Sequence, residues 1–169
     1  EKAEADRKAK EDADRKAAAD KAEAERKAVL ENAAAKPRAL ALASGDKGDD
    51  LKLIKGIGPK NEKTCNELGV HRFAQIAEWT PDNAKWVGHH MAFPGRIERE
   101  HWIPQAKLLA GGADTAYSAG VKSGAIKIDD SSDVPLSDAE ASALGQGVAQ
   151  AAAKADAERQ AALANTAGK

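Results

Sequence analysis

The stretch that decides the fold is DLKLIKGIGPKNEKTCNELG, residues 50–69. The stretch begins with a short helix, on which Leu51 and Ile54 form a single apolar face. The two glycines of Gly56-Ile57-Gly58 permit a tight turn with positive φ. Pro59 suits the first turn of a following helix, because its missing N–H needs no partner there. The stretch therefore predicts two short helices joined by a glycine hairpin.

Further short helices are predicted downstream of this hairpin. Phe73 opens one of them, and Thr80-Pro81 begins another, with Thr80 as the N-cap and proline at the first helical position. A last helix begins at Arg96 and contains Pro104, which is tolerated only if the helix restarts close to it. Residues 49–110 therefore predict a bundle of five short helices.

The composition restricts the core to this region. The chain has 169 residues, of which 42% are hydrophobic and only 4% aromatic. The hydrophobic figure is inflated by alanine: residues 1–36 hold thirteen Ala, ten basic and ten acidic side chains. Five of the six aromatic residues lie between positions 49 and 110. A core of this size argues against a large enzyme domain with an enclosed pocket.

Two arms and two linkers are predicted around the bundle. Residues 1–36 form a charged, Ala-rich helical arm, in which each oppositely charged i, i+4 pair adds roughly 0.2–0.5 kcal/mol. Residues 37–48 form a linker, and residues 111–136 form a flexible linker in which Ile126-Lys127-Ile128 hints at a short strand. An Ala-rich helix over 137–169 begins with a capping box at Ser137.

The hairpin residues resemble the mark of the helix-hairpin-helix family: Gly56, Ile57 and Gly58, followed by the basic Lys60. In nucleic-acid-binding members of that family, hairpin amides hold a phosphate at a helix N-terminus. The resemblance implies that Ile57 fills the angle between the helices and that Lys60 assists binding. The expected fold class is all-α, a small helix-hairpin-helix bundle flanked by Ala/charge-rich helical arms and flexible linkers.

A closer resemblance covers residues 50–110, through FAQIAEWT at 73–80 and FPGRIER at 93–99. These motifs are similar to a module found in accessory proteins of alphaproteobacterial respiratory complex I (NADH:ubiquinone oxidoreductase). The same kind of module is appended to the two-iron iron–sulfur subunit of complex I, and a related one to a large-subunit ribosomal protein. Cys65 is the only cysteine, so the redox function of the iron–sulfur subunit is not implied.

Catalytic and metal chemistry find no support in the residue patterns. The four histidines show no i, i+4 pair of the kind that favours zinc binding, so we expect surface positions for them and no metal site. Cys65 lies on an apolar helix face, where a small core residue is expected rather than a nucleophile. No Walker loop, nucleophile elbow or dinucleotide fingerprint is present. We therefore expect that the protein has no catalytic residues, binds no cofactor and is not an enzyme.

Nucleic-acid binding is the main rival to protein binding. Lys52, Lys55, Lys60 and Lys63 surround the hairpin, yet residues 49–110 hold nine basic and eight acidic side chains. A domain that follows a phosphate backbone normally has a clear basic excess. The hairpin could also simply build a compact helical fold, with its lysines solvated.

The sequence thus predicts a non-catalytic accessory (supernumerary) subunit that braces the hydrophilic arm of bacterial respiratory complex I. Its partners would be subunits of that arm; the alternative is a nucleic-acid- or ribosome-associated binding protein. No apolar run reaches the roughly 18 residues of a membrane span, and the acid-rich start is unlike a signal peptide. We expect the cytoplasmic side of the inner membrane, peripheral through partner subunits. The expected partner-binding residues are Gly56, Ile57, Gly58, Lys60, Arg96 and Arg99.

Overall fold

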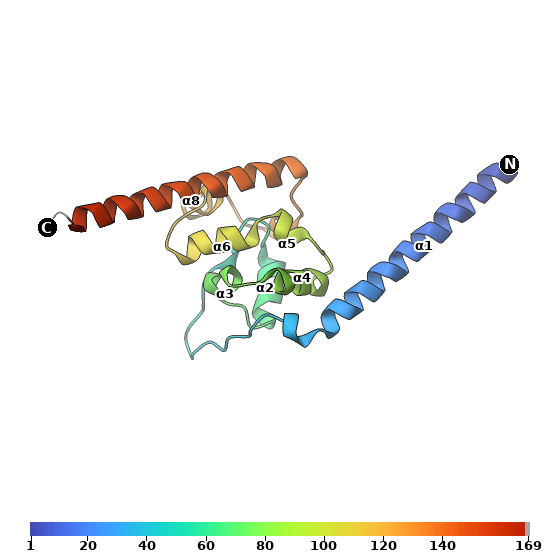
Figure 1. The fold of residues 1–169 in the computed structure, drawn as a ribbon, viewed down its shortest axis with the longest axis horizontal. Helices are drawn as coiled ribbons and strands as arrows, with labels where there is room; N and C mark the ends of the chain where they lie inside the picture. The colour runs from blue at the N-terminus through green and yellow to red at the C-terminus, as the bar shows by residue number, and fades with distance from the viewer. Residues whose placement is uncertain (168–169) are drawn as a thin grey trace.

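Every regular element that the computed structural model describes, over residues 1–167, is helical (Figure 1). The fold is therefore all-α, as expected. Gly168 and Lys169, which end the predicted C-terminal helix, lie outside the described residues. In chain order the elements are α1 (Lys2–Glu31), η1 (Ala33–Ala35), η2 (Leu51–Leu53), α2 (Pro59–Glu67), α3 (Phe73–Ala77), α4 (Pro81–His90), α5 (Arg96–Arg99), α6 (Trp102–Ala110), α7 (Ala116–Lys122), η3 (Asp130–Asp133) and α8 (Asp138–Ala167).

The hairpin is built from η2, Gly56-Ile57-Gly58 and α2. Its first helix is a single 3-10 turn, whose start is capped by the Asp50 side chain accepting from the Lys52 amide. Gly56 has a φ of +101°, which a residue with a side chain rarely adopts. Gly58 is the N-cap of α2, and Pro59 takes the first helical position. The hairpin thus forms where the two glycines predict it.

The predicted last helix is divided into α5 and α6. His101 separates them with a left-handed φ of +56°. Pro104 falls in the first turn of α6, where backbone N–H groups have no intrahelical partner, so its ring displaces no helical bond. A new helix thus begins at Trp102, close to Pro104, and this restart is what allows the proline to be accommodated.

The core lies between the hairpin and the helices that follow it. Ile57 is fully buried at the turn, and α3 packs closely on α6. The largest side chains with under 2% exposure include Trp102 and several branched aliphatics. The buried apolar cluster is Ala35, Leu51, Ile54, Ile57, Cys65, Val70, Phe73, Ile76, Trp79, Ala84, Trp86, Val87, Ile97, Trp102, Ala106 and Leu109.

The end of the N-terminal arm also joins this core. Val29 and Leu30, the only larger aliphatics in residues 1–36, pack against it. The Trp86 Nε1–H donates to the Leu30 carbonyl over 3.3 Å. The Asn83 amide donates to the Ala35 carbonyl over 2.8 Å. The packed region therefore starts about twenty residues before the predicted boundary at Asp49.

The segment predicted as the first linker is held against the turn between α2 and α3. The Leu40 amide donates to the Gly69 carbonyl over 2.8 Å. The Arg72 guanidinium pairs with the carboxylate of Asp46, and the Asp49 amide donates to the His71 carbonyl. Backbone hydrogen bonding thus fixes a stretch without helix or strand.

The second predicted linker contains structure that the sequence interpretation missed. Residues 111–136 include α7 and η3, and the strand hinted at by Ile126 is absent among the described residues. Thr115 and Ser118 are buried and cap α7 reciprocally. Ile126 folds back on α7, where its amide donates to the Gly120 carbonyl. The expectation of a flexible linker is corrected, because capping and this apolar contact outweigh the Gly- and Ser-rich composition.

Two long helices leave the packed region on opposite sides (Figure 1). Helix α1 has 30 residues and packs on α4 through its last turns only. Helix α8 also has 30 residues and lies along α6 and α7 before it continues outward. In the part of the chain that the structure describes, no helix combines the length and the apolar character of a membrane span.

Candidate functional site

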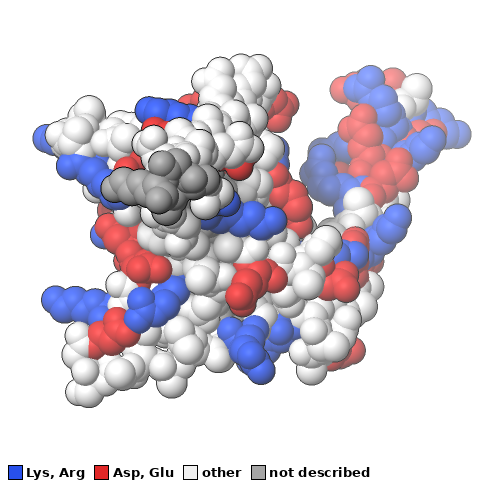
Figure 2. Space-filling model, turned by 60° about the vertical axis from the view of Figure 1, so that its left-hand side comes forward, with Lys and Arg blue, Asp and Glu red and all other residues white. Residues whose placement is uncertain are grey.

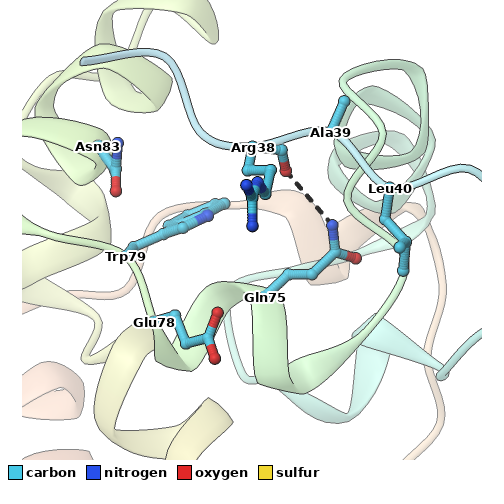
Figure 3. Close-up of a pocket in the computed structure, with 7 residues that line it drawn as sticks. All are labelled: Arg38, Ala39, Leu40, Gln75, Glu78, Trp79 and Asn83. Carbon is cyan, nitrogen blue, oxygen red and sulfur yellow. Dashed lines mark hydrogen bonds between the residues drawn. The ribbon is translucent and has the colours of Figure 1, made fainter. Parts of the chain in front are cut away.

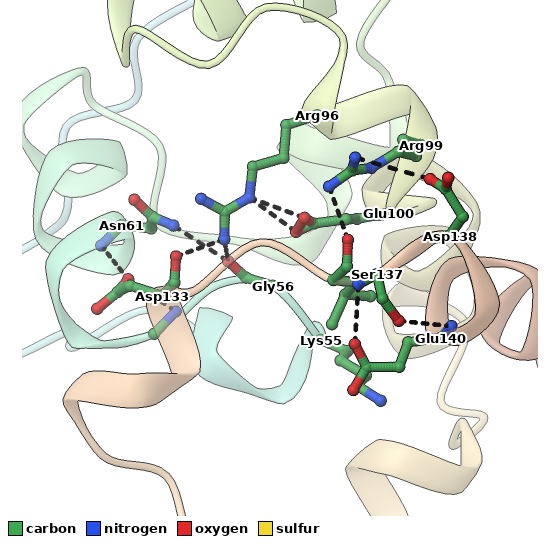
Figure 4. A network of polar contacts seen from close by, with 12 residues as sticks. Lys55, Gly56, Asn61, Arg96, Arg99, Glu100, Asp133, Ser137, Asp138 and Glu140 are labelled. Atoms are coloured by element: carbon green, nitrogen blue, oxygen red, sulfur yellow. Dashed lines mark hydrogen bonds and ion pairs between the residues drawn. The ribbon is translucent and has the colours of Figure 1, made fainter.

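The N-terminus of α2 holds the carboxylate of Asp133, which lies 72 to 75 residues further along the chain. The Asn61 amide donates to its Oδ1 over 2.9 Å (Figure 4). The Gly58 amide donates to the same oxygen over 3.1 Å, and the Lys60 amide donates to its Oδ2 over 3.1 Å. The first amides of a helix have no intrahelical acceptor and carry partial positive charge. Asp133 therefore occupies the anion position that the hairpin creates.

The close approach of Asp133 requires glycine at position 58. A Cβ atom built on Gly58 would lie 2.7 Å from Asp133 Oδ2 and 2.6 Å from its backbone nitrogen. A Cβ on Gly56 would lie 2.2 Å from Glu100 Oε1. The two glycines therefore serve intramolecular contacts as well as the turn itself.

Arg96 lies beneath the hairpin and is buried, with 8% exposure. Its Nε donates to both carboxylate oxygens of Glu100, over 2.9 and 2.8 Å. Its Nη2 donates to the carbonyls of Gly56 and Asp133, over 3.1 and 2.6 Å (Figure 4). Glu100 is fully buried. Arg96 thus joins α5, the hairpin and the end of η3, and it has no face toward solvent for a ligand.

Arg99 continues this network toward α8. Its Nη2 donates to the Leu136 carbonyl over 2.8 Å, and its Nη1 lies 4.0 Å from Asp138 Oδ1. The Ser137 amide in turn donates to Glu140 Oε2 over 2.8 Å, forming the predicted capping box. The amide and hydroxyl of Ser137 hold the pKa of Glu140 below its ordinary value. Polar contacts therefore run from the hairpin to the first turn of α8.

The six residues expected to bind a partner are all found in or beside this network. Hydrogen bonds join five of them to one another or to the segment that begins at Asp133: Gly56, Gly58, Lys60, Arg96 and Arg99. Ile57 instead lies in the core, whereas Lys60 and Arg99 keep part of their side chains exposed. The structure thus brings these residues together around a segment of the same chain.

Sequence reasoning missed Asp133 and Glu100. Asp133 stands in the stretch 129–133, where its acidic neighbours suggest a solvated loop. No local pattern indicates which of those carboxylates reaches a helix N-terminus more than 70 residues away. Glu100 lies four residues after Arg96, and that spacing is a signal that could have identified the ion pair.

The surface around the packed region carries both charge signs. On the face seen in Figure 2, lysine and arginine side chains are interspersed with aspartate and glutamate, without a continuous basic area. The projecting part of α1 shows the same mixture. This distribution matches the near-zero net charge of −1. Extended tracking of a phosphate backbone normally needs a basic stripe, which this face lacks.

A shallow hollow lies between α3 and the first linker (Figure 3). The Gln75 amide crosses it to the Arg38 carbonyl at 3.5 Å and to the Gly69 carbonyl at 2.8 Å. Its volume is about 260 Å³. The lining residues are Arg38, Ala39, Leu40, Gln75, Glu78, Trp79 and Asn83. This set contains no paired nucleophile and base.

One histidine does not lie where the sequence predicts. His89 is buried, with 6% exposure, because it lies on the inner face of α4. Its backbone carbonyl also accepts a hydrogen bond from Arg26 Nε. His90 stacks on Trp86 with ring centroids 5.1 Å apart, and burial lowers its pKa. Across residues 1–167, His, Cys, Asp and Glu form no group of three or more that could hold a metal ion.

Cys65 is expected to be unreactive while the protein is folded. Its thiol is fully buried, and burial raises its pKa to about 12. Because the thiolate is the nucleophile, very little of the reactive form exists at pH 8. We expect no reaction with a chromogenic disulfide reagent in native buffer and one equivalent of reaction in guanidinium chloride. Full reaction of the native protein within minutes would contradict the buried position.

Residues 51–110 match the family described as the RS2/RL21/YNQ2 HHH domain. The chain is 45% identical over 96 residues to the "Uncharacterized 22.9 kDa protein in nqo2 3'region" of Paracoccus denitrificans, covering 54% of this chain and 44% of that protein. No solved structure matches this chain significantly.

Ribosomal proteins are similar over the same region. Large ribosomal subunit protein bL21 of Roseobacter denitrificans is 53% identical over 64 residues, covering 38% of this chain and 30% of that protein. Small ribosomal subunit protein uS2 of Methylocella silvestris is 39% identical over 77 residues, covering 44% of this chain and 22% of that protein. The chain thus spans less than half the length of each of these relatives, and the similarity centres on the helix-hairpin-helix domain.

Proposed function

We propose that this chain is a non-catalytic accessory subunit that binds proteins of the hydrophilic arm of respiratory complex I. The observation that carries the proposal is the occupation of the hairpin amides by Asp133. With those amides engaged inside the chain, the hairpin serves to build a domain rather than to hold a phosphate. The similarity to a protein of the nqo2 3' region supports complex I as the assembly.

The two arms supply the binding surface in this proposal. Helix α1 is about 45 Å long at 1.5 Å per residue, and most of it projects away from the other described residues. Isolated helices gain little stability from propensity alone. Its alternating charges suit a polar protein surface better than a lipid one. We infer peripheral attachment on the cytoplasmic side of the inner membrane, through partner subunits.

Co-purification tests this assignment. The tagged full chain, expressed in its native host, is expected to sediment with NADH dehydrogenase activity and to recover subunits of the hydrophilic arm. A chain lacking residues 1–22 is the matched control, because it keeps every core contact and removes the free part of α1. Its recovery of those subunits should fall about tenfold, for a loss of roughly 1.4 kcal/mol in binding. Recovery without any complex I subunit would refute the proposal.

A ribosome-associated protein is the second candidate, and the similarity to bL21 and uS2 favours it. In that case the chain would sediment with ribosomal subunits in the same experiment. Its binding to duplex RNA or DNA would weaken as salt rises and would be lost in Lys60→Glu. Lys16→Glu is the control, because Lys16 is also exposed but lies on the part of α1 that projects from the packed region. The complex I proposal expects neither variant to change nucleic-acid binding.

A further inference from the structure

A short strap connects the hairpin to the C-terminal arm. We define the strap as residues 133–138, from the end of η3 to the first residue of α8. Asp133 anchors its beginning to three hairpin amides. Leu136 is buried with 8% exposure, and its carbonyl accepts from Arg99. The strap is therefore attached to both α2 and α5, although it contains no α-helix or strand before Asp138.

The direction of α8 depends on this strap. Among its described residues, α8 buries Ala141 and Val148 and covers part of Leu144, all within its first three turns. From Ala149 onward, its side chains are exposed or only partly covered up to residue 165. Small apolar contacts fix a long helix weakly, because burial energy scales with the apolar area removed from water. The strap thus supplies much of what orients the arm.

The bonds at the hairpin form one cooperative unit. The Asp133 carboxylate satisfies three amides that have no other acceptor in the helix, and its carbonyl satisfies Arg96 Nη2. Hydrogen bonds that involve a charged group are roughly twice as strong as neutral ones. If residue 133 leaves the hairpin, the three amides lose their acceptor at the same step, and Arg96 loses one of its carbonyl partners while it keeps Glu100 and Gly56.

We propose that Asp133 is an intramolecular latch that couples the hairpin to the position of α8. With the latch closed, the hairpin amides are covered and α8 lies along α6 and α7. With it open, the amides face solvent and α8 swings on the freed strap. The same contact therefore keeps the hairpin from external anions and presents the C-terminal arm in one orientation. This inference concerns the chain itself and does not depend on which assembly it joins.

The distance between α2 and α8 tests the latch. Spin labels are placed at Glu67→Cys and Gln150→Cys, two exposed positions, in a Cys65→Ala background. The parent is expected to give one narrow distance distribution. Asp133→Ala should broaden it about twofold or more, and should speed amide exchange at Gly58, Lys60 and Asn61 about tenfold, since local opening sets both. Asp130→Ala, an exposed aspartate of the same η3, should leave both unchanged.

Near-UV circular dichroism separates arm release from unfolding. Retention of the tryptophan signal with a broadened distance distribution supports the latch. A narrow distribution in Asp133→Ala with fast amide exchange would overturn it, because α8 would then be held without the strap. If Asp133→Ala loses the tryptophan signal, Asp133→Asn decides the question, since it removes the charge from the latch and keeps the volume of the side chain. A broadened distribution in Asp133→Asn supports the proposal, and an unchanged distribution refutes it.

Discussion

Replacing Arg96 by alanine is expected to lower the free energy of unfolding by about 3–5 kcal/mol. Glu100 is fully buried, and Arg96 Nε is the donor that both of its carboxylate oxygens use. The variant would leave this carboxylate buried without a counter-charge. It would also remove the guanidinium donor from the carbonyls of Gly56 and Asp133. For a domain whose stability is of order 5–15 kcal/mol, such a loss is severe.

Urea titration followed by tryptophan fluorescence measures this effect. Arg99→Ala is the matched control in the same helix, because its side chain is 44% exposed and a loss of about 1 kcal/mol or less is expected. The double variant Arg96→Met/Glu100→Leu should recover most of the loss, since an apolar pair replaces a buried ion pair at little cost. Equal stability of Arg96→Ala and the parent would contradict the buried ion pair as described.

Replacing Trp102 by alanine is expected to cost a similar amount, about 3–5 kcal/mol. Trp102 is fully buried at the start of α6, and its ring meets the Phe93 ring edge to face with centroids 5.7 Å apart. Truncation would leave a cavity between α6 and the hairpin, because a Cβ built on Gly56 already lies 2.7 Å from Trp102 Nε1. The helices around it cannot close that space without moving the hairpin.

Trp102→Phe separates lost volume from lost polarity. Within residues 1–167, Trp102 Nε1 is buried without a hydrogen-bond partner. Removing an unsatisfied buried donor returns about 1–3 kcal/mol, which offsets part of the lost packing. We therefore expect the phenylalanine variant to unfold at a urea concentration much closer to the parent than the alanine variant does. Equal losses in both variants would contradict the cavity as the cause of the lost stability.

The position of Asp133 also clarifies the choice between protein and nucleic-acid binding. A phosphate at the hairpin would have to displace a carboxylate that three amides already hold. The near balance of charge around the domain gives such a phosphate little additional attraction. Protein binding through the arms needs no such displacement. This competition is the physical ground on which the two proposed functions differ.

Local sequence signals were sufficient for the elements near the hairpin. Gly56 takes the positive φ that its place in the turn predicts, and Thr80-Pro81 starts α4 with the expected capping. Pro104 falls in the first turn of a restarted helix. These features depend on residues within one or two turns of each other, so the sequence by itself determines them. The all-α class follows from the same short-range patterns.

Local sequence patterns did not predict the contacts between segments that are far apart in the chain. Val29 and Leu30 look like part of a solvated arm, yet they pack against the core where α1 meets α4. Asp133 looks like one acid among several in a polar loop. Only the tertiary structure places its carboxylate against α2, because that pairing depends on chain geometry over more than 70 residues. The sequence therefore determined the hairpin, and the tertiary structure decided that the chain's own carboxylate fills it.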